Sequence, residues 1–371
     1  DGTFSEGPGY GLGTVMSTLL TYEVAARYLD VPVGDLAHPR ILSAMRFVVE
    51  IERDIPSTAA AFCAGPLAAV EFNSWISPGP LTFFGERYAN VPEMGTFGRH
   101  WLWADQQTVA EVNQNFPRYS LYPDGGWIFA RDSGPSAAEF SFESGLWDGH
   151  GHSWLHKNSI TFGAWGERLL LTRHHVSYAD GRFQATYRTE AYNTFSPLGR
   201  NQDKDGPAGR GSHLHTARDL AWTTVVEADN ATAWTESVER NRRRVLFVRP
   251  HVLLVEDHAK FSASEVAVQS WNSLKPFSQI DDRTSALITP DGTMRISRLT
   301  GIQPRMTITE DSVHRDSFNN LFLPVFRTAF STAPKKEHYL ATLITLSPKG
   351  EGTDQPRIHS EGLDGEYLEI T

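Results

Sequence analysis

The segment from Trp147 to Ser159 contains three histidines, His150, His152 and His156. Residues two apart in a strand point to the same face, so His150 and His152 would project together. Two imidazoles side by side suit either a pair of metal ligands or a general base with an orienting neighbour. A polar turn with solvated histidines is the alternative that involves no chemistry.

A tyrosine near the start of the chain is the second candidate for chemistry. Tyr10 follows Glu6-Gly7-Pro8-Gly9. Glycine and proline leave little room for regular structure, so Tyr10 would enter a helix from a rigid turn. A phenol held in this way can donate or accept a proton when cations lie close to it. Simple packing of the ring at a helix start is the alternative.

A third segment mixes a cation, an acid and two phenols. It contains Tyr187, Arg188, Glu190 and Tyr192. Taken alone, this mixture is typical of an ordinary strand and turn.

The most basic stretch of the chain contains Arg240, Arg242, Arg243 and Arg244. Such a run could line a groove for a polyanion, but more often it is a solvated turn, which is the interpretation we favour. The net charge of −10 disfavours a nucleic-acid partner, which usually requires a basic field or face. A polyanionic glycan meets the same objection unless cations gather in one cleft.

The elements that must position these residues change in character at about Phe116. Before it, apolar residues recur at helical spacing over 15–29 and 41–51, and 108–115 is expected to be a last helix. These few helices would leave apolar faces exposed unless further helices pack on them. We therefore predict a helical domain over 1–116.

After Pro117, short runs of β-branched and aromatic residues alternate with Asp-Gly, Gly-Gly and Pro turn signals. This pattern predicts an antiparallel β-sandwich over 117–371. The segment 201–212 is rich in glycine and charge and is predicted to be a mobile loop. The expected strands include 126–131, 159–162, 168–171, 221–226, 244–248, 251–257, 266–271 and 339–346.

Length and composition agree with two domains. The chain has 371 residues, of which 40% are hydrophobic, which is more than one ordinary core needs. Its single cysteine, Cys63, cannot form an internal disulfide and is expected to be a small buried hydrophobe. No apolar run approaches the ~20 residues of a membrane helix, so no membrane span is expected.

Four segments resemble, in sequence order, the heparinase II/III-like polysaccharide lyases, a group that includes oligoalginate lyases. The Tyr10 segment resembles the family's Asp-Gly, Glu-Gly and Tyr segment. The region 152–171, with Lys157-Asn158-Ser159-Ile160, resembles its His-x-His-x-Asp, Asn-Ser-Phe and Gly-Glu-x-Leu-Leu motifs. The regions 122–131 and 244–257 resemble a strand and a hairpin of the family's sandwich.

This resemblance implies an α+β multidomain fold, with part of an (α/α) toroid followed by a large antiparallel β-sandwich. The implied activity is β-elimination next to a uronate, in an acidic glycan of the alginate or glycosaminoglycan type. The implied catalytic residues are Tyr10 as acid, and in some members also base, and His152 or His150 as base or charge neutraliser. The expected substrate-binding residues are Glu6, Asn158, Trp154 and Arg188, with Arg188 holding a carboxylate through a bidentate contact.

The chain departs from the family at the positions that bind a structural zinc in its metal-containing members. Trp154, Thr172 and Tyr192 fall at or near those positions. We therefore expect no cofactor and no zinc at that site, although His174 and His175 could supply a rearranged one.

The family's carboxylate-neutralising residue usually lies in the toroid upstream of the tyrosine segment. We therefore expect a second polypeptide or a missing N-terminal segment to complete the toroid. The expected partner is an acidic polysaccharide or oligosaccharide, and the expected location is secreted or periplasmic.

Two other functions remain open at this point. The first is a glycan-binding or scaffold module that kept the fold and lost the chemistry. The second is a glycoside hydrolase, which needs two carboxylates flanking the bond, for which Glu6, Asp148 and Glu190 are the candidates.

Overall fold

The structure is a computed structural model that describes most of the second half of the chain. The described residues are 117–350, except 133–136, 148–154, 172–186, 206–208, 236, 301–304 and 317–320, together with parts of 18–47 and residues 358–359 and 369–370.

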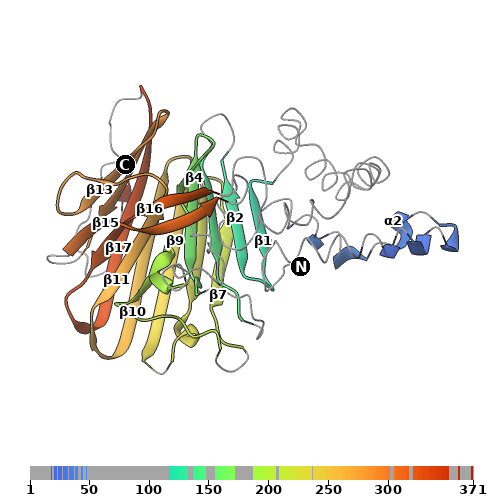
Figure 1. The fold of residues 1–371 in the computed structure, drawn as a ribbon, viewed down its shortest axis with the longest axis horizontal. Helices are drawn as coiled ribbons and strands as arrows, with labels where there is room; N and C mark the ends of the chain where they lie inside the picture. The colour runs from blue at the N-terminus through green and yellow to red at the C-terminus, as the bar shows by residue number, and fades with distance from the viewer. Residues whose placement is uncertain are drawn as a thin grey trace.

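Antiparallel strands dominate the described residues, as Figure 1 shows. A five-stranded sheet has the order β1-β2-β3-β4-β5, so its strands follow one another in the chain as a meander. Its strands are β1 (Tyr119–Tyr122), β2 (Trp127–Arg131), β3 (Glu139–Glu143), β4 (Ser159–Ala164) and β5 (Glu167–Leu170).

The largest sheet has eight strands in the order β12-β13-β14-β17-β10-β9-β8-β7. Its strands are β7 (His213–Asp219), β8 (Thr223–Asp229), β9 (Val238–Val248), β10 (Val252–Glu265), β12 (Ser278–Gln279), β13 (Thr284–Ile288), β14 (Gly292–Arg298) and β17 (Lys335–Pro348).

A four-stranded sheet completes the sandwich in the order β15-β16-β11-β6. Its strands are β6 (Phe195–Pro197), β11 (Ala267–Ser273), β15 (Arg305–Asp316) and β16 (Leu321–Ser331). The short elements are α2 (Val33–Leu36), the 3-10 turns η2 (Thr189–Ala191) and η3 (Ala231–Ala233), and the strand pair β18 (Ile358–His359) and β19 (Glu369–Ile370).

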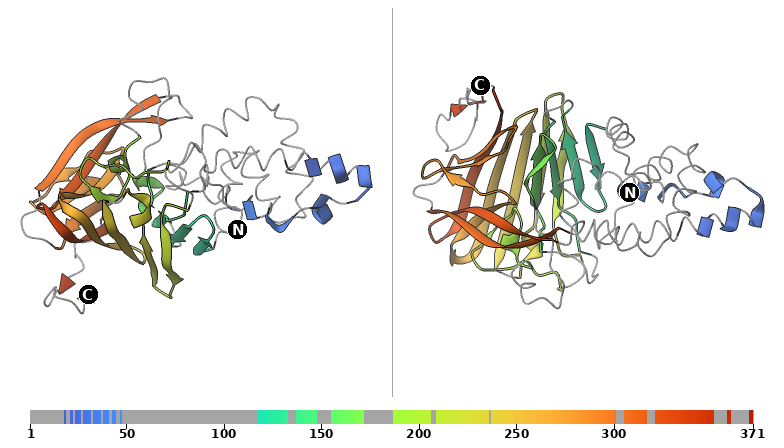
Figure 2. Two further views of the ribbon diagram at one scale, coloured as in Figure 1. Left: turned by 90° about the horizontal axis from the view of Figure 1, so that it is seen from below. Right: turned by 45° about the horizontal axis from the view of Figure 1, so that its top comes forward.

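The main core contains residues of the five-stranded, eight-stranded and four-stranded sheets. Figure 2 shows the arrangement of these sheets from two further sides. Alternate residues of β3, Phe140 and Phe142, enter this core, and Phe140 meets Phe247 of β9 at 6.1 Å between ring centres. Burial of such large aromatic surfaces supplies the main driving force for folding. The predicted antiparallel β-sandwich is therefore confirmed.

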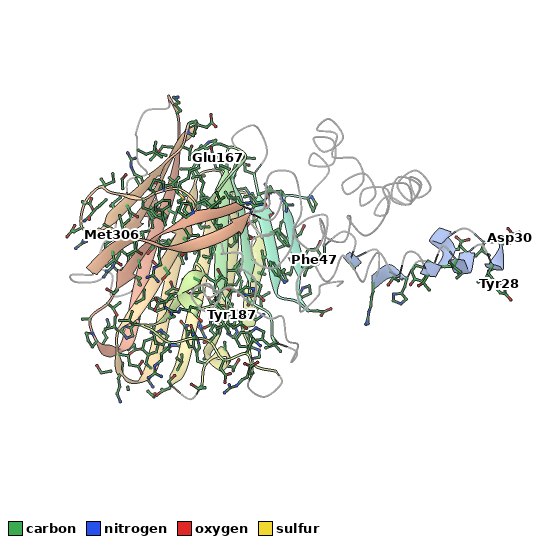
Figure 3. The ribbon with its side chains drawn as sticks, in the orientation of Figure 1. Tyr28, Asp30, Phe47, Glu167, Tyr187 and Met306 are labelled. Carbon is green, nitrogen blue, oxygen red and sulfur yellow. The ribbon has the colours of Figure 1, made fainter. Side chains whose placement is uncertain are left out.

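The opposite face of the five-stranded sheet is buried as well, and part of the N-terminal region covers it. Phe47 packs edge-on against Tyr122 at 5.0 Å and against Trp127 at 5.8 Å between ring centres. Figure 3 shows Phe47 beside the sheet, whereas Tyr28 and Asp30 lie at the far end of the helical segment. We call this face of the five-stranded sheet the Phe47 side.

The predicted helices over 15–29 and 41–51 are described only in part. Helical residues occur between Thr18 and Phe47, and α2 is one of their turns. Of the apolar residues expected on one face of the first helix, Ala26 is buried, whereas Leu29 has 55% of its surface exposed. Neither a toroid nor the boundary at 116 is visible within the described residues, so both stay predictions.

The basic run 240–244 is not the solvated turn that we expected. It lies within β9, where side chains alternate between the two faces of the sheet. Arg243 faces the interior and is buried, whereas Arg242 and Arg244 face outward. The strand extends through the run because β8 and β10 pair with it on both sides.

Candidate active site

Many of the residues predicted to carry chemistry lie outside the described part of the chain. Their predicted roles therefore stay predictions. They are Glu6, Tyr10, Asp148, His150, His152, Trp154, Thr172, His174 and His175.

The described residues do show the two ends of the histidine segment. Strand β3 ends at Glu143 and its neighbour β4 begins at Ser159, so the connection between them includes 148–154. Trp147 precedes that segment and Leu155 follows it, and both side chains are buried.

A buried charged cluster lies directly beside these ends. The Glu143 carboxylate, with 2% of the residue exposed, accepts a hydrogen bond from Lys157 Nζ at 2.5 Å. Its other oxygen, Oε2, lies 3.0 Å from His156 Nδ1. By strand alternation, Glu143 is on the Phe47 side, opposite Trp127 in the register.

The charge of Glu143 follows from this geometry. Burial raises the pKa of its carboxyl, but Lys157 and His156 lower it by more, so the pKa falls to about 2. Glu143 is therefore ionised at neutral pH and can hold the Nδ1–H of His156.

An aromatic side chain fixes the other side of the imidazole. The ring of Tyr192 meets His156 edge to face, with 5.5 Å between ring centres. Tyr192 is buried in the cluster that contains Leu155 and Phe47. This position is one of the three where the family's metal-containing members would supply zinc ligands, and here it packs against a histidine.

No group of three or more potential metal ligands occurs among the residues that the structure describes. Two of the three positions of the family's zinc site, Trp154 and Thr172, lie outside those residues. The expectation of no zinc therefore stays a prediction.

Asn158 occupies a structural position in the turn before β4. Its backbone is left-handed, with φ of 63°, a conformation that asparagine tolerates better than most residues. Its amide is engaged within the protein, because Oδ1 accepts a hydrogen bond from Ser212 at 2.5 Å and Nδ2 donates one to Ala228 at 3.3 Å. The predicted role of Asn158 in substrate binding gains no support from this geometry.

A buried glutamine brings together two of the segments that the sequence analysis singled out. Gln202 donates to the carbonyl oxygen of Lys157 at 3.0 Å and accepts from the Lys157 N–H at 2.9 Å. Its own N–H donates to Thr189 Oγ1 at 2.8 Å. The start of the segment predicted to be a mobile loop, 201–205, is therefore described, and Gln202 within it is held in place.

Asn193 makes a second link between the same segments. Its Nδ2 donates to the carbonyl oxygen of Ile160 at 2.7 Å, and its N–H donates to Ser159 Oγ at 3.2 Å. Gln202 and Asn193 therefore hold the Tyr187–Asn193 segment against the start of β4.

A buried ion pair of the eight-stranded sheet, Arg243–Asp257, also contacts both of these segments. The guanidinium of Arg243 makes two parallel hydrogen bonds to Asp257, at 2.7 and 2.8 Å. Its Nη1 donates to the carbonyl oxygens of Asn158 at 2.8 Å and Asn193 at 2.6 Å. The eight-stranded sheet thereby fixes both segments of the candidate site.

Arg188 is the described cation best placed to meet a ligand at this junction. It precedes η2 and is exposed, next to Tyr187, which packs on the cluster that contains Tyr192. No ion pair of Arg188 occurs within the described ranges. The predicted contact between Arg188 and a substrate carboxylate stays a prediction.

Glu190 has a different role from the one that a hydrolase would require. Its Oε2 lies 2.8 Å from Arg327 Nη1, and its Oε1 accepts a hydrogen bond from the Gly199 N–H at 2.8 Å. This carboxylate is already used to join η2 to β16.

The outward arginines of β9 do not form an open groove for a polyanion. Arg242 pairs with Glu227, and Arg244 pairs with Glu227 at 2.8 Å and lies 3.6 Å from Glu256. Arg240 pairs with Glu337 at 2.8 Å. Each positive charge is offset by a neighbouring carboxylate.

The sequence analysis missed Glu143 and Gln202. A signal existed for Glu143, because Glu139-Phe140-Ser141-Phe142-Glu143 alternates polar and aromatic residues and predicts a strand with acids on one face. No local signal marks Gln202, whose role depends on partners far away in the chain.

Solved structures of heparinases match the whole chain. For the heparan sulfate lyase HepC from Pedobacter heparinus, the TM-score is 0.73 at 14% identity, and the match covers 100% of this chain and 59% of HepC. A HepC mutant gives 0.75 at 12% identity with the same coverage. Another heparinase III gives 0.68 at 12% identity, covering 99% of this chain and 57% of the heparinase.

No protein-family model matches the sequence, and no curated protein matches it. The chain spans 57% to 59% of the length of the heparinases that it matches. In those structures one chain carries both the matched region and the remainder, so they do not support the expected second polypeptide. Among the described helical residues, none forms a helix long and apolar enough to cross a membrane. The chain has a heparinase III-like fold, in agreement with the resemblance of its motifs.

Proposed function

We propose that this protein is a polysaccharide lyase that cleaves uronate-containing acidic glycans, of the alginate or glycosaminoglycan type, by β-elimination. The observation that carries the proposal is the match of the whole chain to several heparinase III structures. The buried carboxylate–imidazole pair of Glu143 and His156 and the exposed Arg188 offer suitable chemistry on neighbouring segments.

The difficulty of the reaction lies in the C5 proton of the uronate. This proton is barely acidic while the neighbouring carboxylate carries its full charge, so a cation or hydrogen-bond donor must offset that charge. Arg188 suits this task because a guanidinium matches a carboxylate with two parallel hydrogen bonds.

The proton transfers are assigned to the residues that the family resemblance indicates. His152 or His150 takes the C5 proton, and the electron pair moves to form the C4–C5 double bond. The C4–O bond breaks, and Tyr10 protonates the leaving oxygen. The products are a shortened glycan and one with an unsaturated uronate at its new end.

The two alternatives lead to different products. A hydrolase would leave saturated ends, and one of its three candidate carboxylates, Glu190, is already paired with Arg327. A non-catalytic module would bind the glycan and leave it intact. A secreted or periplasmic location belongs with the proposed substrate and stays a prediction.

The test is the ultraviolet absorbance of the unsaturated uronate, measured with heparan sulfate, with alginate and with a neutral glycan as control. We expect absorbance to rise with an acidic glycan, and Tyr10→Phe to lower the rate at least ~100-fold while binding is retained. Shortened glycans with only saturated ends would exclude the lyase. Binding without any cleavage would favour the module.

A further inference from the structure

The turn that joins β7 to β8 presents apolar side chains to solvent. Trp222 has 74% of its surface exposed, and Leu220 is exposed as well. The Leu220 N–H donates to the Thr223 carbonyl oxygen at 2.8 Å, which closes a tight hairpin turn with Ala221 and Trp222 at its tip. Single apolar residues are common on protein surfaces, so exposure by itself does not mark a site.

Two arginines hold the backbone of this turn in place. Arg118, which precedes β1, donates to the carbonyl oxygens of Ala221 at 2.9 Å and Leu220 at 3.1 Å. The N–H of Arg249, which follows β9, donates to the Trp222 carbonyl oxygen at 2.9 Å. The indole is therefore presented from a fixed backbone, and such preorganisation lowers the entropy that binding costs.

Both arginines share a single carboxylate. Asp219 Oδ2 lies 3.0 Å from Arg118 Nη2, and its Oδ1 lies 2.6 Å from Arg249 Nη2. Burial raises the pKa of this carboxyl, but hydrogen bonds from Thr224 and both arginines lower it by more, so the pKa lies below its ordinary value. Two guanidinium groups and one carboxylate leave a net positive charge on this cluster, although the whole chain carries −10.

Arg118 can still reach a ligand. Its side chain is 46% exposed, whereas that of Arg249 is buried and contributes only its charge. A guanidinium has five N–H donors, and three of those of Arg118 are used within the turn and its carboxylate. Among the described residues the remaining two have no hydrogen-bond partner, so they can donate to an anionic group.

We propose that Trp222 and Arg118 form a second glycan-binding site, which binds an acidic sugar unit at the β7–β8 turn. The C–H groups of the sugar ring would stack on the indole, whose face carries the negative part of its quadrupole. The carboxylate or sulfate of the sugar would accept hydrogen bonds from the guanidinium. The inference takes its ligand class from the proposed function, but it does not require that the glycan is cleaved.

Strand β7 separates this site from the junction around Asn158. The strand begins at His213, next to Ser212, whose hydroxyl donates to Asn158, and it ends at Asp219. Its seven residues span roughly 20 Å, so a single sugar unit does not reach from one place to the other. The site would therefore serve a polymer that extends along the protein.

Affinity electrophoresis of the full chain tests the proposal. Native gels contain heparan sulfate, alginate or carboxyl-reduced alginate as a neutral polymer, and they are run cold to limit cleavage. We expect Trp222→Ala to weaken binding to an acidic polymer by at least about tenfold, because tryptophans at a contact often supply much of the affinity. Trp222→Phe should keep most of the affinity, since it keeps an aromatic face. Ile288→Ala, which shortens another exposed apolar side chain, should bind as the wild type does.

Arg118→Gln has a matched control in Arg244→Gln. Both side chains are about half exposed and pair with a carboxylate. Arg244 is neutralised, however, because it and Arg242 lie beside two carboxylates, Glu227 and Glu256. We expect Arg118→Gln to lower the affinity for acidic polymers about tenfold and Arg244→Gln to leave it unchanged. Circular dichroism and thermal unfolding establish that the variants are folded, and Trp222→Ala, at an exposed tip, tests the site if Arg118→Gln is not.

The two acidic polymers identify the anionic group. Binding of both polymers through Trp222 would indicate that a carboxylate is sufficient, because alginate carries no sulfate. Binding of heparan sulfate alone would indicate that the guanidinium recognises a sulfate. Either result supports the proposed site.

Failure of this inference differs from failure of the proposed function. Equal affinities of Trp222→Ala and the wild type for both acidic polymers would overturn the inference, whether or not unsaturated products form, and would leave the turn to a protein partner. An effect on the neutral polymer alone would overturn it as well, because the ligand would not be an acidic sugar. A wild type that forms no unsaturated product would overturn the lyase, while a loss of affinity in Trp222→Ala would still support the binding site.

Discussion

Two buried ion pairs of the described residues, Arg243–Asp257 and Glu143–Lys157, have different surroundings. Arg243–Asp257 lies in the core, where the guanidinium reaches two backbone carbonyls and Gln269 Nε2 donates to Asp257 Oδ2 at 2.7 Å. Glu143–Lys157 lies on the Phe47 side, beside a titratable imidazole and at the ends of the histidine segment. A buried charge needs partners in either place, but only the second pair lies next to an imidazole among the described residues.

The two pairs therefore differ in what they contribute to the structure. The core pair joins β9 and β10 to the turn before β4, and all its partners are fixed hydrogen-bonding groups. The core pair therefore holds these elements in a fixed arrangement. The Glu143 pair joins β3 to the start of β4 and also contacts the His156 imidazole.

Loss of one partner of the core pair should have the largest effect on stability. In Asp257→Asn, the buried guanidinium of Arg243 would lose its counter-charge, so we expect the free energy of unfolding to fall by about 3–5 kcal/mol. Denaturation by urea measures this change. Arg243→Met with Asp257→Leu should recover much of the loss, and a fall below about 1 kcal/mol in Asp257→Asn would remove the distinction between the two pairs.

The stability of the Glu143 pair should depend on pH. The carboxyl has a folded pKa of about 2, below its ordinary value of 4.5, so its stabilisation is complete above pH 4.5 and is lost as the pH falls towards 2. The wild type should lose roughly 2–3 kcal/mol over this range beyond any loss seen in Glu143→Gln. Urea denaturation at pH 7, 4 and 3 compares the two proteins, and parallel pH profiles would contradict the assignment.

The turn between the two pairs should have a smaller effect. Asn158→Ala places alanine at a φ of 63° and removes the amide bonds to Ser212 and Ala228, so we expect a loss of about 2 kcal/mol. Asn158→Gly keeps the turn but loses the same amide bonds, so the difference between the two variants isolates the backbone strain. Thermal unfolding of both variants tests this, and equal melting temperatures would show that φ is unimportant here.

The exposed pairs of β9 should have the smallest effect. Arg244→Gln removes a partner of Glu227 whose side chain is 51% exposed, so the unfolding free energy should change by less than about 0.5 kcal/mol. Affinity for an acidic glycan should also stay unchanged, because this arginine is already neutralised. A marked loss of affinity would instead support the hypothesis of a polyanion-binding groove on this face.

The sequence alone predicted the antiparallel sandwich because alternation between polar and apolar residues is a local property of a strand. It also predicted the heparinase-like fold, since the motifs occur in the right order along the chain. It identified the segment around His156 as chemically unusual, and the family resemblance pointed to Arg188, but neither could show that the two segments meet.

The tertiary structure decided which side chains share a site. Glu143 and Lys157 come together because β3 and β4 pair in one register, and Gln202 reaches Lys157 across 45 residues of chain. Such contacts depend on long-range packing, which no local pattern records. Likewise, β9 became a strand with Arg243 inside because Asp257 on the neighbouring strand supplies the buried counter-charge that the run of arginines does not reveal.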